Sequence, residues 1–148
     1  MTRHGGWALL VGALVPITML LASACASGAA GPERIEVEAS DFSFEPAVVT
    51  VSAGTEYSLV FRNSGTVLHD WTIERIPATD VAETGSAGHG MSGMGGMAGA
   101  GGQLHVAAEA GKTSELAFTP TTPGEYEYVC TVPGHRELGM LGRLVVQG

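Results

Sequence analysis

The stretch that decides the fold and the site covers residues 126–140, which read Tyr-Glu-Tyr-Val-Cys-Thr-Val-Pro-Gly-His-Arg-Glu-Leu-Gly-Met. Its first residues predict a β-strand that delivers Cys130 at its end. The Pro-Gly pair then turns the chain, and His135 and Met140 follow at equal gaps of four residues. A thiolate, an imidazole and a thioether from one tight loop can therefore converge on a single ion.

A second imidazole has to come from elsewhere in the chain. His69 lies on a predicted strand, with its side chain on the same face as Trp71. Two histidines and a thiolate in a plane, with a long axial methionine bond, form the ligand set of blue-copper electron-transfer sites. The soft sulfur ligands stabilise Cu(I), while imidazoles suit both oxidation states. We therefore predict one copper ion held by His69, Cys130, His135 and Met140.

Each of these residues has an ordinary structural interpretation when taken alone. His69 fits a hydrogen-bonded core histidine, Met140 a gap-filling core methionine, and Cys130 a buried, inert thiol. Together these interpretations leave the metal-site spacing around the Pro-Gly turn unexplained. Zinc is the competing ion, but its structural sites prefer more thiolates or imidazoles and do not call for methionine.

The rest of the chain after residue 32 has the pattern of short β-strands and no convincing helical period. Apolar and polar residues alternate, and turn signals separate the segments. This pattern predicts an all-β sandwich of seven to eight strands. The predicted strands cover residues 35–38, 48–51, 57–61, 69–73, 104–107, 116–118, 126–130 and 144–146.

The N-terminus has the pattern of an export signal. Arg3 precedes an apolar run over residues 7–21, which is short for a membrane span of ~20 residues. Small residues then precede Cys25, as in a lipoprotein signal, so residues 1–24 are the predicted signal peptide and Cys25 the lipidation site. The alternatives are a retained anchor helix and ordinary signal cleavage near Ala24 or Ala26.

The predicted domain organisation follows from these segments. Residues 25–32 are small and Gly-rich and form the expected flexible tether, and residues 33–148 form the domain. A Gly/Met-rich loop at about 85–102 is inserted in this domain. Its sulfur and imidazole groups form a possible secondary copper-capture cluster, with a low-complexity linker as the alternative. The cluster comprises His89, Met91, Met94 and Met97.

The charge excludes one class of partner. The formal net charge of the 148 residues is −8, and removal of residues 1–24 removes Arg3 and no acid. An acidic surface argues against nucleic acid as a partner.

The motif Cys-Thr-Val-Pro-Gly-His-x-x-x-Gly-Met-x-Gly, with His-Asp-Trp upstream, resembles the cupredoxins, particularly the auracyanin, rusticyanin and sulfocyanin group. The similarity covers roughly Glu33 to Gln147 and includes Asp41-Phe42-Ser43-Phe44 and Asn63. It implies a Greek-key sandwich, copper near one end, and one-electron transfer. It also implies that His135 offers its ring edge to redox partners through an apolar patch, for which Leu138 and Leu141 are candidates.

The sequence departs from the family pattern in two places. Asp70 follows the first histidine, where many cupredoxins place Asn or Ser to brace the loop beneath the copper thiolate. We hypothesise that an ionised Asp70 lowers the reduction potential or titrates at low pH. The Met-rich insertion is the second departure.

The combined interpretation is an exported electron shuttle between respiratory or photosynthetic proteins at the outer face of the cell membrane, or free in the periplasm. It is expected to be a lipid-anchored monomer and not an enzyme, because one mononuclear site offers no second copper for substrate chemistry. The rival interpretation is a copper-binding trafficking or storage protein that uses the Met-rich loop.

Overall fold

The structure is a computed structural model that describes residues 1–2, 31–84 and 102–148. Lipidation at Cys25 and the capture cluster of His89, Met91, Met94 and Met97 therefore lie outside the described residues. The same holds for nearly all of the predicted signal peptide, tether and Gly/Met-rich insertion. Over the ranges that are described, no helix has the length and apolar character needed to cross a membrane.

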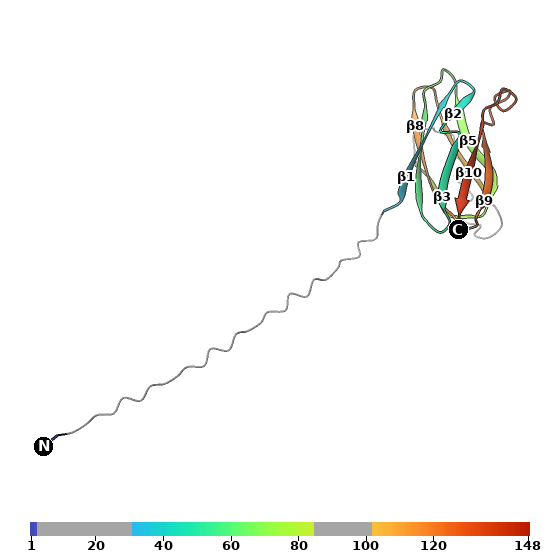
Figure 1. Cartoon of the computed structure of the whole chain (residues 1–148). Helices are drawn as coiled ribbons and strands as arrows, with labels where there is room; N and C mark the ends of the chain where they lie inside the picture. Colours follow the sequence, from blue (N-terminus) through green and yellow to red (C-terminus); the bar gives the residue numbers. More distant parts are fainter. Residues whose placement is uncertain (3–30, 85–101) are drawn as a thin grey trace.

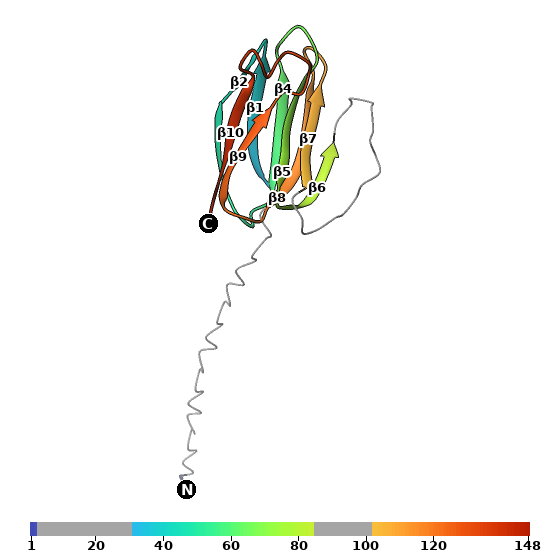
Figure 2. The ribbon, with the colours of Figure 1, turned by 90° about the vertical axis from the view of Figure 1, so that its right-hand side faces the viewer.

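The described residues form ten strands in two five-stranded sheets packed face to face (Figures 1 and 2). One sheet has the order β2-β1-β4-β8-β6 and the other the order β3-β10-β9-β5-β7. The strands are β1 (Glu33–Ser40), β2 (Ser43–Glu45), β3 (Val48–Ser52), β4 (Tyr57–Asn63), β5 (His69–Ile76), β6 (Ala78–Thr84), β7 (Gly102–Ala108), β8 (Thr113–Pro120), β9 (Gly124–Val129) and β10 (Leu141–Gln147).

The connections cross repeatedly between the two sheets. β4 and β5 lie in different sheets, as do β8 and β9, whereas β9 and β10 form an antiparallel hairpin. Two neighbouring pairs are parallel, β1 with β4 and β3 with β10, and each brings together strands that do not follow one another in sequence. The predicted all-β sandwich is confirmed, and its crossing connections are of the Greek-key type.

The sandwich has two strands more than the seven to eight predicted. β2 spans three residues, of which Phe44 is buried, so it is too short to show an alternating pattern. β6 is an edge strand, and residues 80–83 are all exposed. A strand that buries almost no side chain has no reason to alternate apolar and polar residues, and its pairing with β8 arises only in the folded sheet.

The core lies between the two sheets and consists of the inward-facing residues of each strand. Its largest fully buried side chains include Trp71, Tyr128, Phe61 and Phe118. The Trp71 ring lies 5.3 Å from that of Tyr128 and 6.2 Å from that of Phe118, at tilted angles typical of aromatic pairs. Burying one such side chain contributes ~1.5–3 kcal/mol to stability. This aromatic cluster therefore stabilises the core between the two sheets.

Three connections gather at one end of the sandwich, opposite the C-terminus (Figure 1). They are the β1–β2 turn at residues 41–42, the β4–β5 loop at residues 64–68, and the β9–β10 loop at residues 130–140. The parallel pairing of β1 with β4 brings the first two together, since Ala39 pairs with Asn63 immediately before both connections. This end of the sandwich is called the site end below.

The hairpin β9–β10 depends on a glycine opposite a large ring. Gly142 pairs with Tyr128, and a Cβ atom on Gly142 would lie inside contact distance of the Tyr128 ring. We expect Gly142→Ala to lower the free energy of unfolding by ~1–3 kcal/mol, as overpacking in cores does. Urea unfolding measures the effect. Gly102→Ala is the matched control, because no atom of the described residues lies within 4 Å of its added Cβ atom. Equal stability of the two variants would contradict the prediction.

Candidate metal centre

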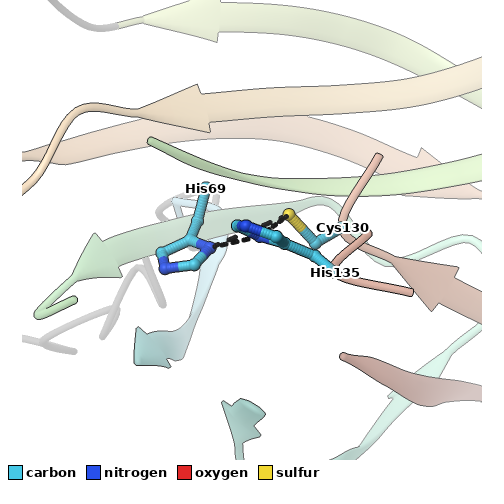
Figure 3. A group of neighbouring side chains, drawn as sticks. All are labelled: His69, Cys130 and His135. Carbon is cyan, nitrogen blue, oxygen red and sulfur yellow. Dashed lines mark hydrogen bonds between the residues drawn. The ribbon is translucent and has the colours of Figure 1, made fainter. Parts of the chain in front are cut away.

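Three of the predicted ligands meet at the site end with their donor atoms facing one another (Figure 3). The Nδ1 atoms of His69 and His135 lie 3.1 Å apart. The Cys130 Sγ atom lies 3.4 Å from His135 Nδ1 and 3.8 Å from His69 Nδ1. All three residues are buried, and the three donor atoms form a compact triangle.

The size of this triangle fits a metal ion. A circle through three points with these separations has a radius of about 2.0 Å, close to the ~2.0–2.3 Å that nitrogen and thiolate ligands keep from a divalent first-row ion. Two imidazole nitrogens and one thiolate would hold an ion there. This donor set is the one associated with blue copper.

The strands deliver His69 and Cys130 to the same place. His69 is the first residue of β5 and shares the inward face with Trp71, as the sequence predicted. Cys130 directly follows β9, which pairs with β5 in the same sheet through Thr72 and Val129. The two ligands therefore sit at adjacent strand ends above the aromatic core.

The β9–β10 loop closes on itself and holds His135 and Met140 beside Cys130. The Met140 amide donates to the carbonyl oxygen of His135 at 3.0 Å, and the Cys130 amide donates to the carbonyl oxygen of Met140 at 3.2 Å. Gly134 and Gly139 have left-handed φ angles of 89° and 96°, which let the chain turn this tightly. Met140 is fully buried and belongs to the same core cluster as Cys130. His69, Cys130, His135 and Met140 are thus positioned as a type 1 copper site.

Burial sets the protonation of the ligands before metal arrives. It lowers the pKa of the His69 imidazole, although the Asp41 carboxylate opposes this effect, and so favours the neutral form that binds metal. Burial also raises the pKa of the Cys130 thiol, opposed by hydrogen bonds from the backbone amides of Asp70 and Val132. A metal ion therefore has to displace the thiol proton on binding.

Asp70 joins the β5 strand to the β9–β10 loop. One carboxylate oxygen accepts the Thr131 amide at 2.9 Å and the Thr72 hydroxyl at 2.9 Å, and the other accepts the Thr131 hydroxyl at 2.8 Å. All three partners act as donors, which matches an ionised carboxylate that only accepts. Asp70 is 4% exposed and braces the residue that follows Cys130.

Asn63 supports the site from the other side. Its side-chain amide donates to the carbonyl oxygens of Val67 at 2.7 Å and Ala108 at 2.8 Å, and its side-chain oxygen accepts the Gly65 amide at 2.9 Å. These bonds fix the β4–β5 loop just before His69.

Three contacts at the site end were not predicted. The His105 Nδ1 atom lies 2.8 Å from the Thr72 hydroxyl, and because that hydroxyl already donates to Asp70, His105 is the donor here. The Phe42 ring stands edge-on to the His135 ring at 5.2 Å. Asp41 lies beside His69. The opening motif around Asp41 and Phe42 was visible in the sequence, but nothing in its spacing indicated which ligand each residue contacts.

Comparison with known families agrees with this geometry. The family of copper-binding proteins that includes plastocyanin and azurin matches residues 33–147. The chain therefore belongs to this family, the cupredoxins, and its cofactor is copper.

Within the family the chain is similar to several characterised proteins. It is 30% identical to auracyanin A of Chloroflexus aurantiacus over 156 residues, covering 93% of this chain and 95% of that protein. It is 32% identical to the copper-resistant cuproprotein CopI of Pseudomonas aeruginosa, covering 82% of this chain and 80% of that protein. A solved structure of auracyanin A, a blue copper protein, superposes with a TM-score of 0.53 at 28% identity, covering 79% of this chain and 100% of that one.

The buried carboxylate of Asp70 gives a prediction about the reduction potential. We expect Asp70→Asn to raise the reduction potential by roughly 40–130 mV, because a nearby negative charge stabilises Cu(II) more than Cu(I) by ~1–3 kcal/mol over a few ångströms. Voltammetry of the copper-loaded protein measures the shift, followed from neutral to acid pH. Asp80→Asn, the same change at an exposed position of β6, is the control. If Asp70→Asn and the wild type have the same potential at every pH, the hypothesis is wrong.

Proposed function

We propose that this protein is an exported one-electron carrier whose single copper ion is held by His69, Cys130, His135 and Met140. The observation that carries the proposal is the triangle of His69 Nδ1, Cys130 Sγ and His135 Nδ1 atoms, with separations of 3.1–3.8 Å. When bound, the copper ion supplies a Cu(II)/Cu(I) couple. Similarity to auracyanin A, named as a blue copper protein, supports the same assignment.

The residues around the triangle favour electron transfer because they hold the ligands in one arrangement. Cys130 and Met140 are tied by a backbone hydrogen bond, and Asp70 braces Thr131 by two. Ligands that stay in place during oxidation and reduction keep the reorganisation cost of electron transfer small. His69 is fully buried and packed against the core. This packing prevents the imidazole from moving when the copper ion changes its oxidation state.

His135 is the proposed exit for the electron. It is 8% exposed and lies at the site end, where the three connections and the first residue of β10 carry large exposed apolar side chains. We call these side chains the apolar rim: Phe42, Val67, Leu68, Leu138 and Leu141. An apolar rim around one nearly buried ligand suits brief docking of a redox protein, because it is desolvated easily and brings His135 close to the partner. The respiratory or photosynthetic identity of such partners rests on the family resemblance.

The proposed location is the outer face of the cell membrane, with the chain held by a lipid on Cys25, and the acting unit is a monomer. The sequence of residues 1–25 supports export and lipidation. Strand β1 begins at the end of the sandwich opposite the site end (Figure 1). A tether that joins the domain there would leave the apolar rim facing away from the membrane.

The protein is proposed to have no enzymatic activity. In the described part of the chain, one cluster of histidine, cysteine and acidic residues can hold a metal, at His69, Cys130 and His135. A single enclosed copper has no neighbouring metal with which to share electrons for substrate reduction.

A second candidate function is copper trafficking or storage. The similarity to CopI, named as a copper-resistant cuproprotein, favours it, together with the methionines of the Gly/Met-rich insertion. In this function the site would pass metal to an acceptor and not electrons.

The identity of the thiolate ligand can be tested by colour. The wild-type protein loaded with Cu(II) should be intensely blue, because the thiolate gives a charge-transfer band, and Cys130→Ser should lose this band. Visible absorption and electron paramagnetic resonance spectra measure the effect. Thr131→Ser keeps the thiolate and is expected to stay blue. An equally blue Cys130→Ser protein would show that the ligand assignment is wrong.

An electron carrier retains its copper, whereas a trafficking protein releases it to an acceptor. We expect reversible one-electron cycling with copper retained, and slow loss of Cu(I) to a competing chelator, because all four ligands are buried. Deletion of residues 86–101 should leave the copper stoichiometry and the uptake rate unchanged. Rapid loss of Cu(I) from the wild type, or uptake that slows severalfold after the deletion, would support trafficking and contradict the carrier.

A further inference from the structure

One nitrogen of a proposed copper ligand has no hydrogen-bond partner in the described structure. The Nε2 atom of His69, on the side of the ring away from Cys130 and His135, is buried and unbonded. A buried N–H without a partner is costly, so its nearest acceptor is of interest. The Asp41 carboxylate lies beside it, with the Oδ1 atom 3.6 Å away.

The carboxylate of Asp41 is held in this place by the loop next to it. Its Oδ1 atom accepts the Thr66 amide at 3.1 Å, and the Thr66 hydroxyl lies 3.3 Å from its Oδ2 atom. The next residue, Phe42, has a left-handed φ of 66°, which a bulky side chain seldom adopts. This turn places Asp41 beside His69 and the Phe42 ring against His135. One two-residue turn therefore contacts both histidines.

Gly65 supplies the space for the pair to meet. A Cβ atom on Gly65 would lie 2.7 Å from Asp41 Oδ1 and 2.7 Å from His69 Nε2, so any larger residue would press on both atoms. Gly65 does not have a left-handed φ. Glycine is therefore required here by the approach of these two side chains and not by the backbone conformation.

We propose that Asp41 is a positioning residue for His69, and that its carboxylate accepts a hydrogen bond from the His69 Nε2–H group in the space left by Gly65. The proposal rests on the copper function proposed above. A neutral imidazole carries one ring proton, so a proton held at Nε2 leaves the Nδ1 lone pair free and aimed at Cys130 and His135. Carboxylate acceptors on the far nitrogen of a metal-binding histidine fix the ring and make it a stronger donor. A stronger, more negative ligand shell favours Cu(II) over Cu(I).

Three variants separate the parts of this proposal. Asp41→Ala removes the acceptor and its charge, Asp41→Asn keeps an acceptor oxygen for Thr66 and His69 but removes the charge, and Gly65→Ala keeps the charge but forces the pair apart. Glu38→Gln is the matched control. Glu38 is a carboxylate near the same loop that accepts the Ser64 hydroxyl at 2.7 Å, with no contact to a histidine given by the structure.

The first readout needs no copper. In the metal-free protein labelled with ¹⁵N at histidine, we expect a downfield, slowly exchanging Nε2 proton of His69 in the wild type and in Glu38→Gln. It should persist in Asp41→Asn and be lost in Asp41→Ala and Gly65→Ala. Backbone amide spectra check that each variant is folded, and Asp41→Asn keeps the test decisive if Asp41→Ala unfolds.

The second readout is copper binding. We expect Asp41→Ala to weaken Cu(II) binding about 10-fold, as loss of such partners does, with a smaller change for Cu(I). A tenfold change in the ratio of the two affinities raises the potential by ~59 mV for one electron. Asp41→Asn should shift it in the same direction by less, and Glu38→Gln should leave it unchanged. Asp41→Ala that matches Glu38→Gln in both readouts overturns the proposal. A wild type that binds no copper overturns the proposed function, while the metal-free resonance still decides whether Asp41 holds His69.

Discussion

The contact on which the rest of this structure depends is the meeting of two imidazole nitrogens and one sulfur at the end of an apolar core. His69 and Cys130 are separated by 61 residues in sequence, yet their donor atoms lie 3.8 Å apart. Three buried polar atoms would destabilise the fold if they were left without partners, and a single ion satisfies all three. At the site end, these buried polar atoms therefore need either a bound metal or hydrogen bonds among the ligands themselves.

Because the ligands come from different elements, the surrounding polar residues have to keep those elements in register. Asp70 ties β5 to the β9–β10 loop, and Asn63 ties β4 to the β4–β5 loop and to the end of β7. Beneath them, the packed rings of Trp71 and Tyr128 resist displacement. Buried hydrogen bonds between segments cost free energy to break. They therefore keep the three donor atoms in place when the oxidation state changes. In the proposed function, this rigidity suits the site to losing an electron while it keeps its metal.

The outward side of the centre has a different character. His135 is the most exposed of the ligands, and the apolar rim lies at the same end of the sandwich, with Phe42 against the His135 ring. The acidic groups of the sandwich lie mainly along the strands. Docking at such a rim depends on desolvation and shape and only weakly on charge, which suits short-lived encounters with more than one partner. The same turn that supplies Phe42 to the rim supplies Asp41 to His69, so the surface and the interior of the centre are linked by one short segment.

The sequence by itself determined the all-β class and the group of candidate ligands, because both depend on local pattern. Alternation along β3, β8 and β10 indicates which face of each strand is buried. The short gaps among Cys130, His135 and Met140 keep these three residues within reach of one ion. Only the tertiary structure decided that β2 and β6 pair at all, since neither buries enough to show a pattern. It also decided that Asp41 and Gly65 meet at His69. That contact depends on the parallel register of β1 with β4, which places the β1–β2 turn beside the β4–β5 loop. The spacing of these two connections in the sequence does not indicate that they meet.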